Sequence, residues 1–232
     1  MKLEVLADAD AVARRAAAVI AAEATAAVAA RGRFVIAVSG GSTPWAMLRE
    51  LAKLPLPWPD VHLMQVDERV AANGDAQRNL THIEENLLAH VPLPPGQVHA
   101  MPVEATDLDA AAKNYIDTLR EVAGSPPVLD LVHLGLGADG HTASLLPGDP
   151  VLVATADVAL SGIYQGRRRM TLTYPAIDRA RRILWLVTGT EKMAMLTRLI
   201  DGDRAIPAGR VRQESALLLA DAAATTSLDR PQ

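Results

Sequence analysis

The chain has 232 residues, half of them hydrophobic, which is enough to build the core of one large α/β domain. The net charge of −4 and the pI near 5.9 argue against a nucleic-acid-binding protein, and an aromatic content of 3% argues against a stacking platform for single strands. Because there is no cysteine, disulfides, thiol catalysis and cysteine metal sites are excluded.

No segment approaches about 20 uninterrupted apolar residues, so we expect no membrane span. The alanine-rich stretch 16–30 is interrupted by Glu23 and Thr25, and the residues before it carry aspartates as well as arginines. This pattern predicts an amphipathic surface helix rather than a signal peptide. We therefore expect a cytoplasmic protein made of a single domain over residues 1–232.

Helix-like and strand-like segments alternate along the chain. In chain order we expect a helix over 9–32, a strand over 33–41, a helix over 42–53, a strand over 61–69, a helix over 76–91, a short strand within 92–103, a helix over 107–124, a strand over 128–137, an extra strand within 151–160, a strand and a short helix from Pro175 within 168–180, a strand over 181–189, a helix over 190–201 and a last strand over 215–221. Near-continuous apolar strands between helices predict a three-layer αβα fold with a mostly parallel, Rossmann-like sheet.

Ligands of such sheets bind at the carboxyl ends of the strands. Three polar or glycine-rich segments directly follow predicted buried strands, namely 39–43, 67–69 and 135–141. If the strands are parallel, all three segments meet at one edge of the sheet. This edge is the predicted site.

The first segment, "VSGGSTP", predicts a phosphate cradle. Gly40 and Gly41 let the backbone approach a ligand, and the start of the next helix offers N–H groups and a dipole that favours an anion. We expect Ser42 or Thr43 to cap that helix and to add hydroxyl donors. The segment lacks the lysine of a Walker A loop and the third glycine of GxGxxG, so it favours a phosphomonoester over a nucleotide. A capped strand-to-helix turn with no ligand is an equally good interpretation of this segment alone.

The second segment, Asp67-Glu68-Arg69, combines a cation with two carboxylates. Arg69 could form a bidentate contact to phosphate, and a neighbouring carboxylate could orient a hydroxyl or act as a base. Taken alone, the segment is better explained as a solvated charge cluster at a strand end.

The third segment, "GLGADGHTASLLPG", predicts a catalytic histidine. His141 suits general-base work near neutral pH, and Asp139 lies two residues before it. Gly135, Gly137 and Gly140 would let backbone N–H groups of the segment face a developing oxyanion. His133 falls inside the strand pattern and predicts a hydrogen-bonded core histidine. No metal-ligand spacing such as HExxH is present, so we expect no metal.

Two further groups of cations follow in the sequence. Lys192 comes just after a strand end, a glycine and a threonine, which repeats the logic of the first segment. Arg167, Arg168 and Arg169 precede a strand, and at least one of them is expected to be surface charge.

Together, "FVIAVSGGSTP", "DER", "GLGADGHTASLLPG", "RRMTLTYPAIDRARRILWLVTGTEK" and "IPAGRV" resemble the 6-phosphogluconolactonase family over nearly the whole chain. The resemblance implies the fold of the glucosamine-6-phosphate deaminases, ribose-5-phosphate isomerases and CoA transferases. It also implies hydrolysis of a sugar-phosphate lactone in the oxidative pentose phosphate pathway, with no cofactor. Related deaminases typically have a glutamate that helps the histidine open a sugar ring, whereas this chain has Leu146, which weakens the deaminase interpretation.

The resemblance also implies roles for individual residues. The expected catalytic residues are His141, which activates water, and Asp139 and Asp67, which orient substrate, water or the histidine. The expected phosphate-binding residues are Gly40, Gly41, Ser42, Thr43, Arg69, Arg169 and Lys192. Family members often have Ser-Asn-Tyr where this chain has Arg78-Asn79-Leu80, so the role of that segment stays open. We expect a small-molecule lactone as the partner, no nucleic acid and no membrane, and a monomer or weak homodimer. A sugar-phosphate-binding regulator and a silent paralogue remain alternatives.

Overall fold

The computed structural model describes residues 1–226; the last six residues of the predicted domain, 227–232, lie outside the described part. The strands are β1 (Lys2–Leu6), β2 (Phe34–Val38), β3 (Val61–Gln65), β4 (Asp67–Arg69), β5 (Val98–His99), β6 (Leu131–Gly135), β7 (Val158–Leu160), β8 (Arg169–Leu172), β9 (Arg182–Val187) and β10 (Ala216–Asp221). The α-helices are α1 (Ala9–Arg31), α2 (Ser42–Leu51), α3 (Asn79–Asn86), α4 (Leu108–Ala123), α5 (Tyr174–Asp178), α6 (Met193–Ile200) and α7 (Ala222–Thr225).

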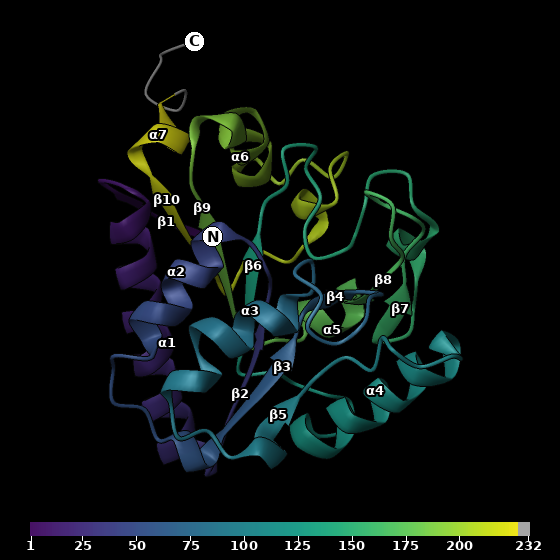
Figure 1. Cartoon of the computed structure of the whole chain (residues 1–232). Helices are drawn as coiled ribbons and strands as arrows, with labels where there is room; N and C mark the ends of the chain where they lie inside the picture. Colours follow the sequence, from purple (N-terminus) through teal and green to yellow (C-terminus); the bar gives the residue numbers. More distant parts are fainter. Residues whose placement is uncertain (227–232) are drawn as a thin grey trace.

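The central sheet has seven strands in the order β1-β10-β9-β6-β2-β3-β5, and each neighbouring pair is parallel. Helices flank this sheet on both sides (Figure 1). This architecture confirms the predicted three-layer α/β fold with a mostly parallel sheet.

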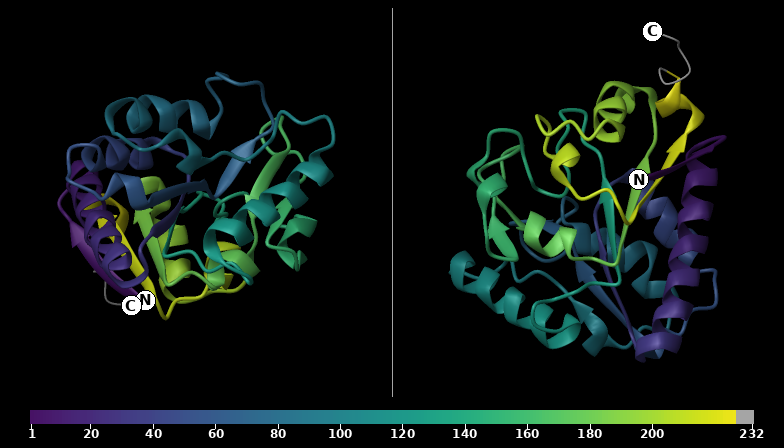
Figure 2. Two further views of the ribbon diagram at one scale, coloured as in Figure 1. Left: turned by 90° about the horizontal axis from the view of Figure 1, so that it is seen from below. Right: turned by 180° about the vertical axis from the view of Figure 1, so that it is seen from behind.

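Strand β2 shows why both faces of the sheet are covered. Its five residues are all buried, and successive side chains point to opposite faces. Phe34, Ile36 and Val38 join a core with apolar residues of α1, α2 and α3. Val35 and Ala37 join a second core with α4, α5 and α6. The two helix layers are visible on either side of the sheet in Figure 2.

A second, smaller sheet corrects one prediction. The expected single strand over 61–69 is two strands: β3 belongs to the central sheet, whereas β4 pairs antiparallel with β8 in a three-stranded sheet of order β4-β8-β7. The chain changes sheets at Val66, whose N–H donates to Val38 and whose carbonyl accepts from Leu172. Asp67 to Arg69 therefore form a strand rather than a loop, which fixes the direction of their side chains.

The other differences lie at the ends of elements. The helix expected over 76–91 covers only Asn79–Asn86, followed by a 3₁₀ turn, and the helix expected over 190–201 begins with a 3₁₀ turn before Met193. The short strand in 92–103 and the extra strand in 151–160 are confirmed as β5 and β7. Strand β1 was not predicted.

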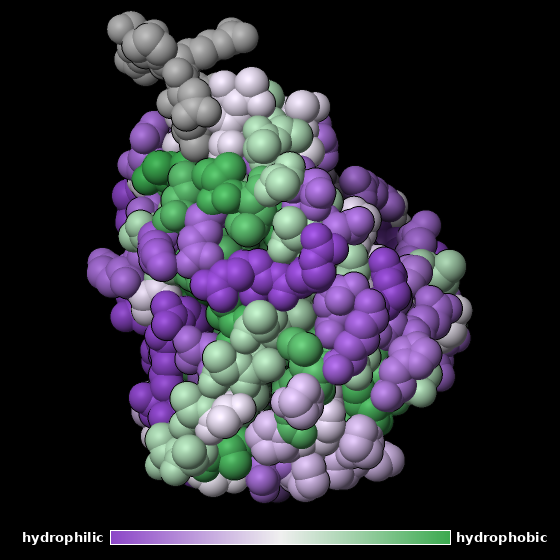
Figure 3. Space-filling view, turned by 90° about the vertical axis from the view of Figure 1, so that its left-hand side faces the viewer, coloured by the Kyte–Doolittle hydropathy of each residue, from purple (hydrophilic) through white to green (hydrophobic). Residues whose placement is uncertain are grey.

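Strand β1 forms one edge of the central sheet, beside β10. It leaves Leu3 and Val5 exposed. Figure 3 shows this side of the molecule, where hydrophobic and hydrophilic residues alternate in patches. Within residues 1–226, no helix combines the length and the hydropathy needed to cross a membrane.

Candidate active site

A cavity of about 420 Å³ opens where the segments after β2, β6 and β9 meet. These three strands are parallel neighbours, so their carboxyl ends lie at one edge of the sheet. The cavity is lined by all but one of the site residues predicted from the sequence: Gly40, Gly41, Ser42, Thr43, Asp67, Arg69, His141, Arg169 and Lys192. The remaining one, Asp139, bonds the His141 side chain.

The segment between β2 and α2 offers backbone donors to this cavity. Gly41 is the N-cap of α2, so no capping side chain accepts a hydrogen bond from the N–H groups of the first turn. The prediction that Ser42 or Thr43 caps the helix is wrong, because the helix already begins at Ser42. The Thr43 hydroxyl instead shares a hydrogen bond with the Thr188 hydroxyl, at 2.6 Å, beyond the end of β9. The unpaired N–H groups of the first turn and the helix dipole favour an anion at this point.

Asn79 ties this segment to strand β4. A Cβ atom on Gly40 would overlap the Asn79 side-chain oxygen, so the close approach requires glycine. The Asn79 side chain donates to the Asp67 carbonyl at 2.8 Å and accepts from the Arg69 guanidinium. Its backbone N–H donates to the buried carboxylate of Glu68 at 2.8 Å. The role that the sequence left open at Asn79 is therefore to connect the first and second segments.

Arg69 and Arg169 lie directly opposite each other in the β4–β8 pair. Burial and then the charge of Arg69 lower the pKa of Arg169. Within residues 1–226, neither guanidinium belongs to an ion pair. Like charges at directly opposite positions destabilise a sheet. An anion in the cavity would relieve this repulsion, which favours a negatively charged ligand.

Asp67 is buried at the cavity wall. Its carboxylate accepts from the Ser144 hydroxyl at 2.6 Å and from the Asn79 side-chain amide at 3.3 Å. Ser144 belongs to the "TASL" run, which the sequence did not predict to be part of the site. These donors fix the orientation of the carboxylate toward the ligand space.

His141 and Asp139 form the pair with acid/base geometry. The His141 Nδ1 atom lies 2.5 Å from Asp139 Oδ1, and the His141 backbone N–H donates to the same oxygen at 3.1 Å. Burial alone would raise the pKa of Asp139, but the backbone N–H and the imidazole of His141 outweigh it and lower that pKa. Asp139 is thus an ionised acceptor, which favours the proton on Nδ1; in the neutral ring this tautomer leaves the lone pair on Nε2.

The backbone hydrogen bonds of the third segment limit which N–H groups can face a ligand and explain one glycine. The N–H of Gly137 donates to the His141 carbonyl at 2.8 Å, and the N–H of Gly140 donates to the Gly137 carbonyl at 3.0 Å. Because both N–H groups are already bonded within the segment, Gly137 and Gly140 do not themselves supply oxyanion donors. A Cβ atom on Gly137 would overlap His141 Nδ1, so glycine is needed here for the histidine to approach the loop.

Lys192 ends a 3₁₀ turn, Thr190–Lys192, that follows β9. Thr188 and Glu191 line the cavity beside it. The Gly189 N–H donates to both carboxylate oxygens of Asp221, at 3.1 and 3.2 Å, which holds the turn in place. The structure thus brings the predicted lysine to the side chains of the first segment, whereas no local pattern in the sequence indicated Asp221.

His133 is the buried core histidine that the sequence predicted. Its Nδ1 atom accepts from the Ser39 N–H at 3.2 Å, and the Ser39 hydroxyl donates to the His133 carbonyl at 2.9 Å. Burial lowers the pKa of His133 to about 3, so the ring is neutral. It positions Ser39, at the start of the first segment, and does not line the cavity.

Two cavity residues that the sequence did not predict, Tyr164 and Gln165, come from the turn between β7 and β8. Among the three arginines that follow, Arg167 donates to the Asp75 carboxylate at 2.9 Å, while Arg169 lines the cavity. Arg167 is thus already neutralised, which distinguishes it from Arg169.

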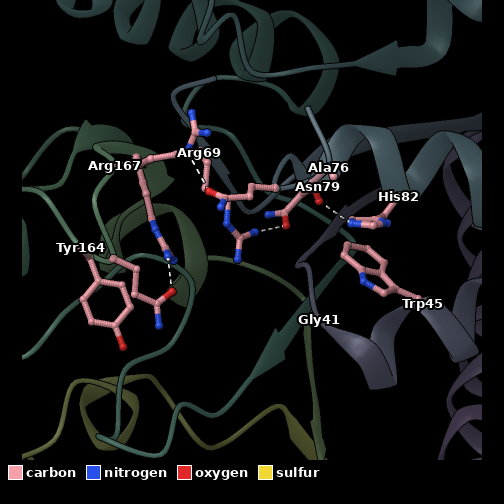
Figure 4. A pocket seen from close by; sticks show the side chains of 11 residues that line it. Gly41, Trp45, Arg69, Ala76, Asn79, His82, Tyr164 and Arg167 are labelled. Carbon is pink, nitrogen blue, oxygen red and sulfur yellow. Dashed lines mark hydrogen bonds between the residues drawn. The ribbon is translucent and has the colours of Figure 1, made fainter. Parts of the chain in front are cut away.

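A second pocket of about 320 Å³ adjoins the first, and Arg69 and Arg169 line both. Figure 4 looks into it, with Tyr164 and Arg167 on one side and Trp45 and His82 on the other. The rings of Trp45 and His82 lie 5.0 Å apart. Arg69 and Asn79 lie between the two sides.

Comparisons with known proteins agree over nearly the whole chain. A family model described as glucosamine-6-phosphate isomerases/6-phosphogluconolactonase matches residues 7–219. The chain is 37% identical to the 6-phosphogluconolactonase of Mycobacterium tuberculosis over 218 residues, which are 88% of each protein. It is 33% identical to the 6-phosphogluconolactonase of Nostoc sp. over 234 residues, 97% of this chain and 98% of that protein.

Solved structures extend this agreement to three dimensions. The 6-phosphogluconolactonase of Thermotoga maritima superposes with a TM-score of 0.83 at 25% identity, covering 95% of this chain and 98% of that one. The enzyme of the same name from Trypanosoma brucei superposes with a TM-score of 0.84 at 25% identity, covering 98% of each chain. A monomeric glucosamine-6-phosphate deaminase shares the fold, with a TM-score of 0.85 at 18% identity over 97% of this chain and 99% of that one.

Proposed function

Because the chain belongs to the glucosamine-6-phosphate isomerase/6-phosphogluconolactonase family, we propose that it hydrolyses 6-phospho-D-glucono-1,5-lactone to 6-phospho-D-gluconate. The observation that carries this proposal is the Asp139–His141 pair beside a cavity with three cations. An acid/base beside an anion site is what hydrolysis of a phosphorylated ester requires. In this proposal the enzyme acts in the oxidative pentose phosphate pathway, in the cytoplasm, without a cofactor.

In this proposal the phosphate group binds at the first turn of α2. The backbone N–H groups after Gly41 and the hydroxyls of Ser42 and Thr43 are hydrogen-bond donors, and Lys192 supplies a charge from the neighbouring turn. Arg69 and Arg169 add two cations to the same cavity. Holding the phosphate fixes the lactone ring relative to His141, which replaces an encounter in solution by a fixed orientation.

His141 Nε2 takes a proton from water while the water oxygen attacks C1 of the lactone. The tetrahedral intermediate carries a negative charge on the former carbonyl oxygen, and the Arg169 guanidinium at the cavity lowers its energy. The intermediate then collapses, the C1–O5 bond breaks, and Nε2 returns the proton to O5. The carboxylic acid that forms loses its proton to water. Asp139 holds Nδ1 throughout and stabilises the transient imidazolium.

The test is a lactonase assay on the purified protein, corrected for the unaided hydrolysis of the lactone. We expect His141→Ala to lower kcat by about 10²- to 10⁴-fold, which is the usual contribution of a positioned acid/base. His90→Ala, at an exposed histidine whose ring bonds the Glu85 carbonyl, is the matched control. A His141→Ala protein with wild-type kcat would show that the base is a different residue. Ammonia release from glucosamine 6-phosphate by the wild type would favour a deaminase instead.

A second variant tests the phosphate site. We expect Arg69→Ala to raise KM for the phosphorylated lactone much more than KM for the unphosphorylated lactone. Only the phosphorylated lactone carries the anionic group that Arg69 would bind. Equal effects on both substrates would remove Arg69 from the phosphate site. Binding of the phosphorylated sugar without any turnover would instead support a sugar-phosphate-binding regulator.

A further inference from the structure

The turn between β7 and β8, residues 161–168, brings a tyrosine to the catalytic pair. We call it the β7–β8 hairpin. Tyr164 and Arg167 exchange backbone hydrogen bonds at 2.9 and 3.3 Å, and Gln165 and Gly166 between them have φ angles of 52° and 80°. The hairpin is therefore a closed two-residue turn that presents Tyr164 in a defined direction.

Tyr164 contacts both members of the pair. Its hydroxyl donates to Asp139 Oδ2 at 3.3 Å, while Asp139 Oδ1 is occupied by His141. The Tyr164 ring meets the His141 ring edge-on, with centroids 5.4 Å apart. The Arg169 guanidinium lies over the Tyr164 ring, 4.9 Å from its centroid, and helps to hold the ring in place.

We propose that Tyr164 is a positioning residue that fixes the Asp139 carboxylate so that it faces His141 Nδ1. The proposal rests on the proposed function, because it concerns the same histidine. With one oxygen bonded to the tyrosine and the other to the imidazole, the carboxylate cannot rotate without losing a hydrogen bond. At 3.3 Å the tyrosine bond is long, so it orients the carboxylate while leaving most of its charge to the imidazole.

The ionisation of the phenol agrees with this role. Partial burial and then the charge of Asp139 raise the pKa of Tyr164, so the hydroxyl keeps its proton and remains a donor at neutral pH. The side chain of Asp139 is about two-fifths exposed, so water competes for its oxygens. A fixed donor such as the Tyr164 hydroxyl would keep the carboxylate from rotating toward water.

Tyr164→Phe isolates the hydroxyl, because the ring remains to pack on His141 and Arg169. We expect kcat for the lactone to fall by about tenfold and KM to stay within twofold, since the hydroxyl acts on the base and not on the phosphate. Ile163→Ala is the control: Ile163 is 75% exposed on the same hairpin, and the variant should keep wild-type kcat and KM. An unchanged kcat in Tyr164→Phe, or a change confined to KM, would overturn the proposal.

A double-mutant cycle with Asp139→Asn separates positioning from general damage. If Tyr164 acts through Asp139, adding Tyr164→Phe to Asp139→Asn should lower kcat by less than twofold further. A full tenfold further loss in the double variant would show that the tyrosine acts independently, and would refute the proposed route.

A measurement without turnover keeps this proposal apart from the proposed function. The Nδ1 proton of His141 should give a low-field NMR signal in the wild type, absent in Asp139→Asn and broadened by faster water exchange in Tyr164→Phe. A wild-type protein that leaves the lactone untouched would end the proposed function, and the broadening would still support Tyr164 as the residue that positions the pair. An unchanged signal in Tyr164→Phe would overturn the positioning role.

Discussion

His133 predicts an acid sensitivity that can be calculated. The side chain is fully buried in β6, and its Nε2 atom has no hydrogen-bond partner among the described residues. Its pKa is about 3 in the folded protein, against about 6.5 for an unfolded histidine. Between these values only the unfolded chain takes up the proton, so stability is full above pH 6.5 and declines as the pH falls toward 3.

The size of the effect follows from the two pKa values. One pH unit in this window is worth about 1.4 kcal/mol, and from pH 7 to pH 4.5 the linkage amounts to about 2.5 kcal/mol. The variant His133→Asn removes the titration, while an amide oxygen can still accept from the Ser39 N–H. The free energy of unfolding of the wild type should therefore drop by about 2.5 kcal/mol more than that of the variant over this range.

Urea unfolding followed by circular dichroism at pH 7 and pH 4.5 provides the measurement. The comparison uses the change with pH in each protein, so a general loss of stability in His133→Asn does not affect it. His62 and His99, whose pKa values burial also lowers, are present in both proteins and cancel. Equal losses in the wild type and the variant would refute the reasoning.

Three further predictions concern packing and assembly. Gly137→Ala should lower kcat by about 10²-fold, because the new Cβ displaces His141. Gly135→Ala is the control and should keep most activity, because its Cβ meets nothing within 4 Å. Measurements of kcat and of thermal unfolding on both variants check this prediction. Glu68→Gln should reduce the free energy of unfolding by about 3 kcal/mol in urea titrations. The buried Arg78 would lose one of its two carboxylate partners, at 3.6 Å, and an amide NH2 cannot accept the N–H bonds that one carboxylate oxygen of Glu68 accepts. Sedimentation velocity should show a monomer of 24.6 kDa or a weak dimer, and a stable tetramer would contradict this.

The sequence predicted the elements whose pattern is local. The helix over 9–32 is confirmed as α1 because good helix formers run without interruption to Gly32, which ends the helix in the left-handed conformation. The three segments of the site were found because the ends of parallel strands converge whatever their detailed pairing. These predictions needed no knowledge of distant contacts.

The parts that the sequence did not predict depend on distant partners. The change of sheet at Val66 is decided by the pairing of Asp67 with Thr171, about a hundred residues away. Strand β1 pairs only with β10, near the other end of the described chain. Tyr164 is a lone tyrosine in a polar turn, and its value to the site comes from Asp139, 25 residues before it. No local pattern carries such information.

Leu146 shows how the structure sharpens the choice between lactonase and deaminase. The side chain is buried and does not line the cavity, and within residues 1–226 the carboxylate that bonds the His141 ring is that of Asp139. A lactone already has a carbonyl carbon open to attack, and its hydrolysis moves one proton from water to the ring oxygen. One imidazole completes that transfer, so a second carboxylate at position 146 would have no proton to carry. A sugar whose ring must open before reaction needs the additional group, and this chain has a leucine there.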